Sequence, residues 1–415
     1  MTGANGFLGS WVVHYALLKG FRVRAAMRGS TDASKTGHLV TLPGAAERLE
    51  FAELDLAESD QTEFERCVED CTLVAHCASP VTARKTKDEL ADVIAPAKEG
   101  TMALLRAVSS PSGASVRTVV VTSCLHAACG GWTAQELAAQ DHTVSEKLWA
   151  KVEAMHGYAK SKAVAERAAW DAYESKFPDW TLCTILPAML VGPSLSPRLS
   201  EGVSWLSNLL QNRITVLPTM PIPFVDVRDA AEAHLAALTA PRLRIKNRRF
   251  LLCTDKVLTV SEIMDFYRRD FALMGVEGAT LGEKLNGRAS SAFPRELRSF
   301  FPFWGFTRDE KVDSYPSRQR LHLAYRDADI TLGDAAQSAV LHGHAPRVPG
   351  FIQLWRPPMD PKFELPPPPR DAAESGASTP GAVPAVDRTS ASDGAASQSK
   401  SGSTMLGRVR TKTGL

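Results

Sequence analysis

Short apolar segments alternate with segments of helical periodicity through the first 190 residues of the chain. The apolar segments are rich in Val, Leu and Phe, as buried parallel strands are. Such alternation predicts a parallel sheet with helices on both faces, and right-handed crossovers restrict it to the doubly wound α/β type. The predicted strands are Phe21–Met27, Leu49–Leu54, Thr72–Ala78, Val116–Thr122 and Thr181–Leu186, and the predicted helices are Ser10–Lys19, Ser59–Glu69, Asp88–Ser109 and Val152–Ser175.

A glycine-rich loop, Thr2–Gly9, opens the chain and leads directly into the first predicted helix. Its glycines permit a tight turn and a close approach of the backbone to a pyrophosphate, while the helix N-terminus offers free N–H donors. A plain glycine turn is the alternative, but the βα units that follow favour a dinucleotide site. We predict that this site includes Gly3, Gly6, Phe7, Leu8 and Gly9.

A strand should precede such a loop, yet only Met1 stands before Thr2. In the doubly wound topology that strand lies in the middle of the sheet. We therefore expect the first strand to be missing, either because the sequence is a truncated form of a longer chain or because another segment replaces it.

The choice of dinucleotide depends on the end of the second strand, where an acid binds the ribose of NAD and an Arg accommodates the 2′-phosphate of NADP. No acid lies between Phe21 and Ser30, and the strand ends in Arg28. Arg28 and Lys35 are thus predicted to hold a phosphate, with two solvated surface cations as the alternative. Asp55 ends the next strand and is predicted either to bind the adenine or to cap the helix Ser59–Glu69.

Tyr158 and Lys162 are four residues apart in a predicted helix and share one face of it. A fixed ammonium near a phenol lowers its pKa, so the tyrosine can exchange a proton with a carbonyl oxygen. Tyr158 and Lys162 are therefore predicted to be catalytic.

These motifs together resemble the extended short-chain dehydrogenase/reductases of the NAD-dependent epimerase/dehydratase superfamily. Within it the chain is similar to the dihydroflavonol reductase and cinnamoyl-CoA reductase group. The resemblance implies a Rossmann fold, NADP(H) and reversible reduction of a carbonyl. It also implies that Ala78 and Ser79 lie near the cofactor, with Pro187 beside the nicotinamide. The motifs are Thr2–Gly9, Asp55-Leu56, His76–Val81, Glu99–Thr101, Thr122-Ser123, Tyr158–Lys162, Pro193–Pro197 and Phe224–Asp229.

The chain departs from that family's pattern where the fifth strand should end in Thr-Ser-Ser, because it reads Thr122-Ser123-Cys124. The second Ser polarises the substrate carbonyl in the family, whereas a thiol is a weak donor. We assign this role to Ser123 or Cys124, and both are candidate catalytic residues.

Beyond Pro187 the pattern is less regular, with predicted strands at Ile214–Val216 and Phe250–Cys253 and predicted helices at Arg228–Thr239 and Ser261–Leu273. We predict an NADP-binding Rossmann domain at 1–187. A smaller C-terminal substrate-binding lobe, interleaved with the last Rossmann strands, is predicted at 188–356. A Pro-rich spacer and disordered tail are predicted at 357–415, where apolar surface is too scarce to offset the entropy of ordering.

The charge balance of 48 Lys plus Arg against 46 Asp plus Glu gives no reason to expect nucleic-acid or membrane binding. The seven scattered cysteines indicate reduced thiols and a cytoplasmic location. We predict no metal, a small-molecule partner and a possible homodimer through helices that include that of Tyr158. The basic run Arg244–Arg249 is predicted to be a solvated turn. Trp149, His156 and Trp170 are predicted to pack, and Asp226 and Asp229 to form a turn and a helix cap.

The sequence thus predicts an NADP(H)-dependent oxidoreductase that acts on a ketone or aldehyde, or on the corresponding alcohol, with Tyr158 as acid and base. Two alternatives remain: a nucleotide-sugar epimerase or dehydratase with bound NAD(H), and a cofactor-binding protein with impaired catalysis.

Overall fold

The computed structural model describes residues 1–80, 88–176, 178–198, 200–211, 221–270, 310–347 and 352–359. These residues belong to one compact unit, Met1–Glu364. The predicted strand Ile214–Val216 and the predicted tail from residue 360 lie outside the described residues. The subdivision of this unit into two domains stays a prediction.

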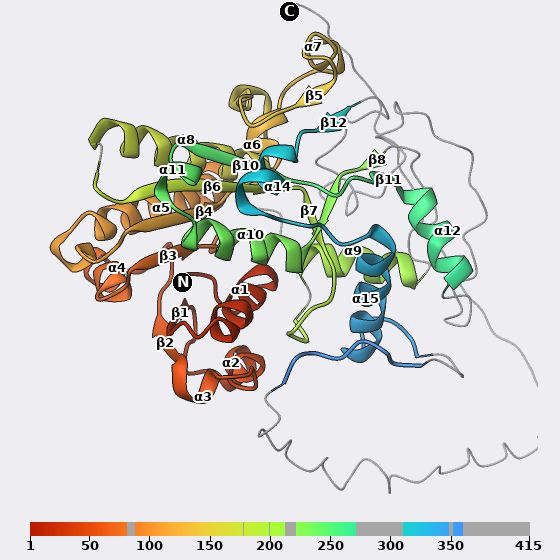
Figure 1. Cartoon of the computed structure of the whole chain (residues 1–415), viewed down its shortest axis with the longest axis horizontal. Helices are drawn as coiled ribbons and strands as arrows, with labels where there is room; N and C mark the ends of the chain where they lie inside the picture. Colours follow the sequence, from red (N-terminus) through yellow and green to blue (C-terminus); the bar gives the residue numbers. More distant parts are fainter. Residues whose placement is uncertain are drawn as a thin grey trace, which may run out of the picture. The chain divides into compact units, whose positions relative to one another are not determined.

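The central sheet is parallel, and its strands lie close to the predicted positions (Figure 1). Four strands follow one another in the order β10, β6, β4, β3, and a parallel pair, β1 and β2, continues the sheet beyond β3. The predicted α/β doubly wound class is confirmed. The bounds are β1 Val23–Met27, β2 Leu49–Glu53, β3 Leu73–His76, β4 Thr118–Thr122, β6 Thr181–Pro187 and β10 Arg248–Leu252.

No strand of the described residues precedes the glycine-rich loop, and the bridge residue Thr2 stands in the place of the first strand, as the alternative of a replacing segment predicts. Thr2 forms parallel bridges to Ala26 of β1 and to His76 of β3. The backbone N–H of Thr2 donates to Ala75 O at 2.9 Å, and that of Gly3 donates to Ala26 O at 2.9 Å. The residues Met1–Gly3 therefore join β1 to β3, and apolarity could not reveal so short a segment.

Helices cover both faces of the sheet, as predicted (Figure 1). Alternate residues of β4 show the reason: Val120 packs with the α1 and α10 side, whereas Val119 and Val121 pack with the α4, α5 and α8 side. Both faces of the strand are apolar, so each needs a helical cover. The bounds are α1 Phe7–Leu18, α4 Gln61–Val68, α5 Ala95–Val108, α8 Gly157–Lys176 and α10 Val227–Thr239.

A second apolar core lies beyond the sheet, around the fully buried Trp205 and Tyr267. Its principal helices are α9 Glu201–Leu210, α12 Val260–Asp270 and α15 Ala328–Leu341, of which only α12 is predicted from the sequence. The short strands β7 Met189–Val191 and β9 Phe224–Asp226 pair in parallel beside it. The remaining elements are α2 Ala33–Val40, α3 Ala45–Arg48, η1 Leu90–Ile94, η2 Pro111–Gly113, α6 His126–Cys129, α7 Ala134–Ala138, β5 Thr143–Val144, η3 Val152–Ala154, β8 Pro221–Ile222, α11 Arg242–Ile245, β11 Leu258–Thr259, β12 Lys311–Val312 and α14 Tyr315–Leu321.

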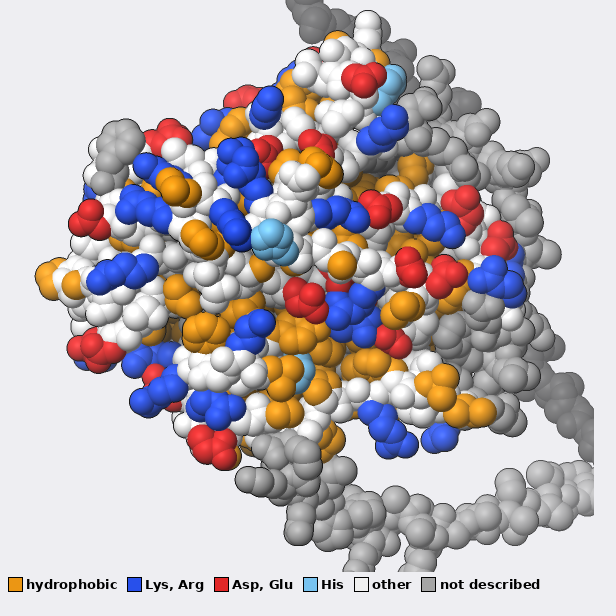
Figure 2. Space-filling model, viewed as in Figure 1, with side chains coloured by type: hydrophobic (Ala, Val, Ile, Leu, Met, Phe, Trp, Pro, Cys, Tyr) orange, Lys and Arg blue, Asp and Glu red, His pale blue; other side chains and the backbone are white. Residues whose placement is uncertain are grey.

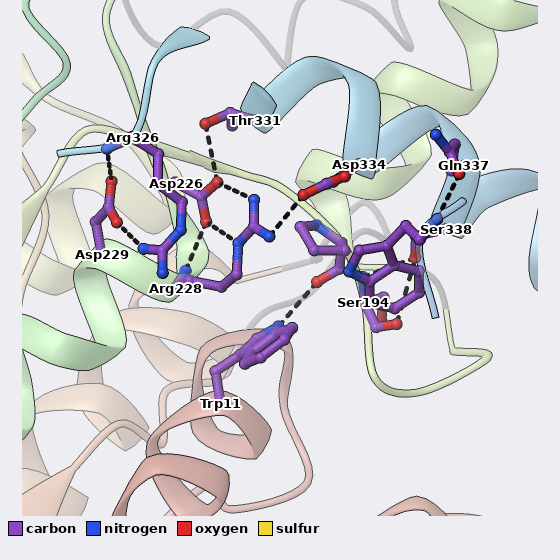
Figure 3. Close-up of polar contacts among 12 residues, drawn as sticks. Trp11, Ser194, Asp226, Arg228, Asp229, Arg326, Thr331, Asp334, Gln337 and Ser338 are labelled. Carbon is purple, nitrogen blue, oxygen red and sulfur yellow. Dashed lines mark hydrogen bonds and ion pairs between the residues drawn. The ribbon is translucent and has the colours of Figure 1, made fainter. Parts of the chain in front are cut away.

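Ion pairs connect the start of α10 to α15 and to the segment that leads into α15 (Figure 3). Asp226 caps α10 by accepting from Arg228 N, and Arg228 in turn pairs with Asp334 at 2.6 Å. Asp229 pairs with Arg326. Burial raises the pKa of Asp229 to about 6, although the contacts with Arg326 act to lower it. The predicted turn and cap are thus present at Asp226, and both carboxylates also join the second core to the sheet.

The surface mixes both signs of charge over the face drawn in Figure 2. Lys and Arg side chains stand among Asp and Glu rather than forming one basic field, which agrees with the near-neutral net charge of +2. Among the described residues, no helix is both long and apolar enough to cross a membrane.

Candidate active site

The predicted site residues meet at one edge of the sheet, where the parallel strands end. In the doubly wound fold this carboxyl edge is where ligands bind. Arg28, Asp55, Ala78 and Cys124 follow β1, β2, β3 and β4, and Pro187 ends β6. The other predicted residues at this edge are Gly3, Gly6, Phe7, Leu8 and Gly9 of the loop and first helix, Lys35 of α2, Leu56 and Ser79 after β2 and β3, Ser123 after β4, and Tyr158 and Lys162 of α8.

The glycines of the opening loop hold its backbone close to the first helix. Gly3 has a φ of +68°, which side chains rarely adopt, and a Cβ there would lie 2.7 Å from Ala78 N. A Cβ on Gly9 would lie 2.1 Å from Gly3 O. No side chain fits at either position, so the N-terminus of α1 comes within reach of a ligand on the loop.

A buried chain of polar side chains fixes the loop to β3. His76 shares one ring nitrogen with the Thr2 hydroxyl at 2.8 Å and the other with the Thr101 hydroxyl at 3.1 Å. Burial lowers the pKa of His76 to about 3, so the ring is neutral. The sequence motifs contain these residues, but only the fold brings Thr2, His76 and Thr101 together.

One buried hydroxyl group lies at the edge of the sheet, between β3 and the glycine-rich loop. The hydroxyl of Ser79 is buried and has no hydrogen-bond partner among the described residues. Together with the tight backbone at Gly3 and Gly9, it fits a polar ligand such as a dinucleotide. We therefore find the residues present suited to the predicted cofactor.

The two predicted phosphate ligands, Arg28 and Lys35, lie in the turn after β1 and in the first turn of α2. The Arg28 side chain is 73% exposed and lies 3.8 Å from the Asp55 carboxylate. Lys35 lies 3.6 Å from Asp32. The alternative that Asp55 caps the following helix is wrong, since Asp60 caps α4 in a capping box.

The catalytic candidates on α8 differ in burial. Lys162 is 5% exposed and its ammonium donates to the backbone carbonyl of Thr122 at the end of β4. Burial lowers the pKa of Lys162. Tyr158 is one turn earlier and 37% exposed, so its side chain is open to an incoming molecule.

The structure separates Ser123 from Cys124. Ser123 is 3% exposed and donates to the Glu166 carboxylate at 2.7 Å, behind the edge of the sheet. Cys124 lies 3.9 Å from the ring of His126. Burial raises the pKa of the Cys124 thiol to about 11, so it is a neutral S–H group. Of the two candidates, the geometry favours Cys124 for contact with a substrate.

A buried ion pair, which sequence reasoning missed, lies directly behind these residues. Arg249 donates to Glu166 at 2.8 Å, and both side chains are almost fully buried. Arg249 also donates to the carbonyls of Ala127, Glu146 and Leu148, and it stacks on Trp149 at 3.6 Å. The prediction that Arg249 lies in a solvated turn is therefore wrong, because it occupies β10 in the core.

Of the three residues predicted to pack near α8, Trp170 is buried at 4% exposure. Trp149 is sandwiched between Arg167 and Arg249. His156 is exposed, so the prediction of packing is wrong for it.

Comparison with known proteins identifies the family. Residues 1–253 match the model of the NAD dependent epimerase/dehydratase family. The chain belongs to this family. The resemblance predicted from the motifs is confirmed.

Two of the relatives that this chain resembles are plant reductases. It is 35% identical over 246 residues to cinnamoyl-CoA reductase CAD2 of Medicago truncatula, which covers 57% of this chain and 71% of the relative. It is 30% identical over 279 residues to a bifunctional dihydroflavonol 4-reductase/flavanone 4-reductase of Malus domestica, with 65% and 75% covered. These relatives place the chain among the oxidoreductases of the family.

A solved structure shows the same fold. Gre2 of Candida albicans in complex with NADPH matches with a TM-score of 0.65 and 24% identity, over 82% of this chain and 98% of Gre2.

Proposed function

We propose that the chain is an NADP(H)-dependent oxidoreductase that reduces a ketone or aldehyde, or oxidises the corresponding alcohol. The observation that carries the proposal is the placement of Tyr158 and Lys162. Both lie on α8, and the buried Lys162 ammonium is fixed on the Thr122 carbonyl at the carboxyl edge of the sheet. The reductases among the relatives support the same reaction class.

The residues of the chain supply the proton transfer of this reaction. Lys162 holds a positive charge one helical turn from Tyr158, which favours the phenolate and lowers the barrier to proton release. The phenol of Tyr158 donates its proton to the carbonyl oxygen of the substrate, or takes it from the alcohol in reverse. The nicotinamide group, when bound, supplies or accepts the hydride.

Cofactor binding falls to the residues at the sheet edge. The loop from Gly3 to Gly9 and the N-terminus of α1 would hold the pyrophosphate. Arg28 and Lys35 provide the positive charge for a 2′-phosphate, and the NADPH complex of Gre2 supports this choice. In this proposal Asp55 and Leu56 lie at the adenosine, with Ala78, Ser79 and Pro187 along the remainder of the cofactor.

A second candidate function, cofactor binding with impaired catalysis, is favoured by Cys124. A neutral thiol at the place of the family's serine is a weak donor to a substrate carbonyl.

The homodimer through the helix of Tyr158 remains part of the proposal. Binding of NAD as a fixed group in an epimerase is disfavoured by Arg28.

Turnover measurements on a Tyr158→Phe variant test the proposal. Consumption of NADPH is followed with a panel of ketones and aldehydes. The variant should lose about 10²–10⁴-fold in kcat and keep its affinity for NADPH, because only the proton donor is removed. Tyr315→Phe, on α14 and 62% exposed, is the matched control. Equal turnover in Tyr158→Phe and the wild type would overturn the mechanism, and NADPH binding without turnover of any carbonyl would favour the second candidate.

A further inference from the structure

The turn that follows β1 already holds an anion from its own chain. The backbone N–H groups of Gly29 and Ser30 donate to the Glu53 carboxylate at 2.6 and 2.7 Å. The Ser30 hydroxyl donates to the same carboxylate at 2.8 Å. These donors of Ser30 and Gly29 lower the pKa of Glu53, although the side chain is exposed. The turn is thus an anion cradle, and Glu53, the last residue of β2, occupies it.

The cations of this turn have acidic partners as well. Arg28 faces Asp55 at 3.8 Å, and Lys35 faces Asp32 at 3.6 Å. Lys35 also lies over the turn, since a Cβ on Gly29 would be 2.5 Å from its ammonium nitrogen. With Glu53, three carboxylates surround two cations, so the local formal charge is negative before a phosphate enters.

We propose that Glu53 determines cofactor selectivity by competing with the 2′-phosphate of NADP(H) for the turn. This inference rests on the proposed function. A phosphate dianion can reach the N–H groups of Gly29 and Ser30 only after the carboxylate leaves them, and it then meets like charge. NAD(H) carries a hydroxyl at this position, which can donate to a carboxylate instead. Glu53 therefore weakens the binding of NADP(H) and leaves the binding of NAD(H) unchanged. The preference of the wild-type chain for NADPH over NADH is thus smaller than Arg28 and Lys35 alone would produce.

The test is a Glu53→Gln substitution, which removes the charge and keeps an acceptor for the turn. Nicotinamide fluorescence gives the Kd of NADPH and of NADH for the full chain. Displacement by adenosine 2′,5′-bisphosphate and by 5′-AMP isolates the 2′-phosphate. We expect NADPH and the bisphosphate to bind about tenfold tighter to the variant. We expect NADH and 5′-AMP to bind equally or more weakly.

The effect is electrostatic, so it should shrink in about 0.5 M salt. Glu50→Gln is the matched control, because Glu50 lies on the same strand, is half exposed and pairs with Arg24 instead. Its ratio of NADPH to NADH affinity should equal that of the wild type.

Equal changes for both nucleotides, or none, would overturn the role of Glu53 and leave the proposed function intact if the wild type turns over NADPH. Failure of the wild type to bind either nucleotide would overturn both proposals.

Discussion

The buried pair of Arg249 and Glu166 makes the strongest prediction about stability. Replacing Arg249 by Met keeps most of the side-chain volume and the apolar contact with Trp149, but removes the guanidinium. Glu166 would then keep two donors, the hydroxyls of Ser123 and Thr184, each at 2.7 Å. The backbone carbonyls of Ala127, Glu146 and Leu148 would also lose the hydrogen bonds that the Arg249 guanidinium donates to them.

The expected cost follows from the burial of both groups. Removing one partner of a buried ion pair destabilises by about 3–5 kcal/mol, because the other charge stays in the core. At roughly 2 °C per kcal/mol for a large domain, the melting temperature should fall on the order of 6–10 °C. Arg248→Met is the matched control, since Arg248 is the neighbouring residue on β10 and its pair with Glu146 is partly exposed. That pair should contribute about 1 kcal/mol or less.

The loss of stability in Arg249→Met should depend on pH, because it depends on the charge of Glu166. In the wild type, burial alone would raise the pKa of Glu166, but Arg249 and the hydroxyls lower it overall. A lowered folded pKa gives stability that is present above the unfolded pKa and lost as the pH falls through the folded one. Without Arg249, burial prevails and the pKa of Glu166 should rise, so the carboxyl protonates at a higher pH. The difference between Arg249→Met and the wild type should therefore be largest near pH 7 and narrow toward pH 5.

Thermal and urea unfolding at both pH values measure this difference. A Glu166→Gln/Arg249→Met double variant removes the buried charge and should recover part of the stability at pH 7. A loss in Arg249→Met no larger than in Arg248→Met, or a loss independent of pH, would refute the reasoning.

Two further predictions concern the sheet edge. Cys124→Ser should raise kcat by about tenfold or more, because a hydroxyl donates better than a thiol to a developing oxyanion; steady-state rates show this, and an unchanged kcat, or an equal rise in the buried control Cys129→Ser, would contradict the role of Cys124. Gly9→Ala should destabilise by about 1–3 kcal/mol and weaken NADPH binding, because its Cβ would meet Gly3 O at 2.1 Å. Gly37→Ala on α2 has no atom within 4 Å of its Cβ and should stabilise by roughly 0.5–1 kcal/mol, so calorimetry that finds the same sign for both glycines would refute the steric argument.

The sequence predicts the strands of the central sheet because each is a short apolar run, and burial on both faces leaves that mark in the residues themselves. It cannot identify the segment that replaces the first strand, because Met1–Gly3 is too short to form an apolar run. Its position depends on hydrogen bonds to Ala26 of β1 and Ala75 of β3, which are 23 and 73 residues further along the chain. The helices α9 and α15 are not predicted from the sequence. They pack against each other and against α12 in the second core, and these contacts join segments that are far apart in the chain.

The site shows the same division. The loop glycines, Tyr158 and Lys162 can be proposed from the sequence, because each motif lies within a few residues. The acids around Arg28 are not, since a search from Phe21 to Ser30 cannot reveal that Glu53 ends the adjacent strand and that Asp55 follows it. Arg249 is misread because its charged neighbours suggest solvent, whereas its partner Glu166 stands 83 residues earlier.

The two buried polar clusters explain what the motifs leave out. Thr2, His76 and Thr101 hold the glycine-rich loop, and Ser123, Glu166 and Arg249 hold the end of β4 and the loop beyond it. A buried ion pair is weak evidence for stability, since apolar residues of the same volume often stabilise as well. Apolar residues could not donate to the carbonyls of Ala127 and Leu148, which lie within the segment between Cys124 and Tyr158. The cost of burying Glu166 and Arg249 is thus better explained by the geometry that they impose at the carboxyl edge of the sheet, where we propose the active site, than by the stability of the fold.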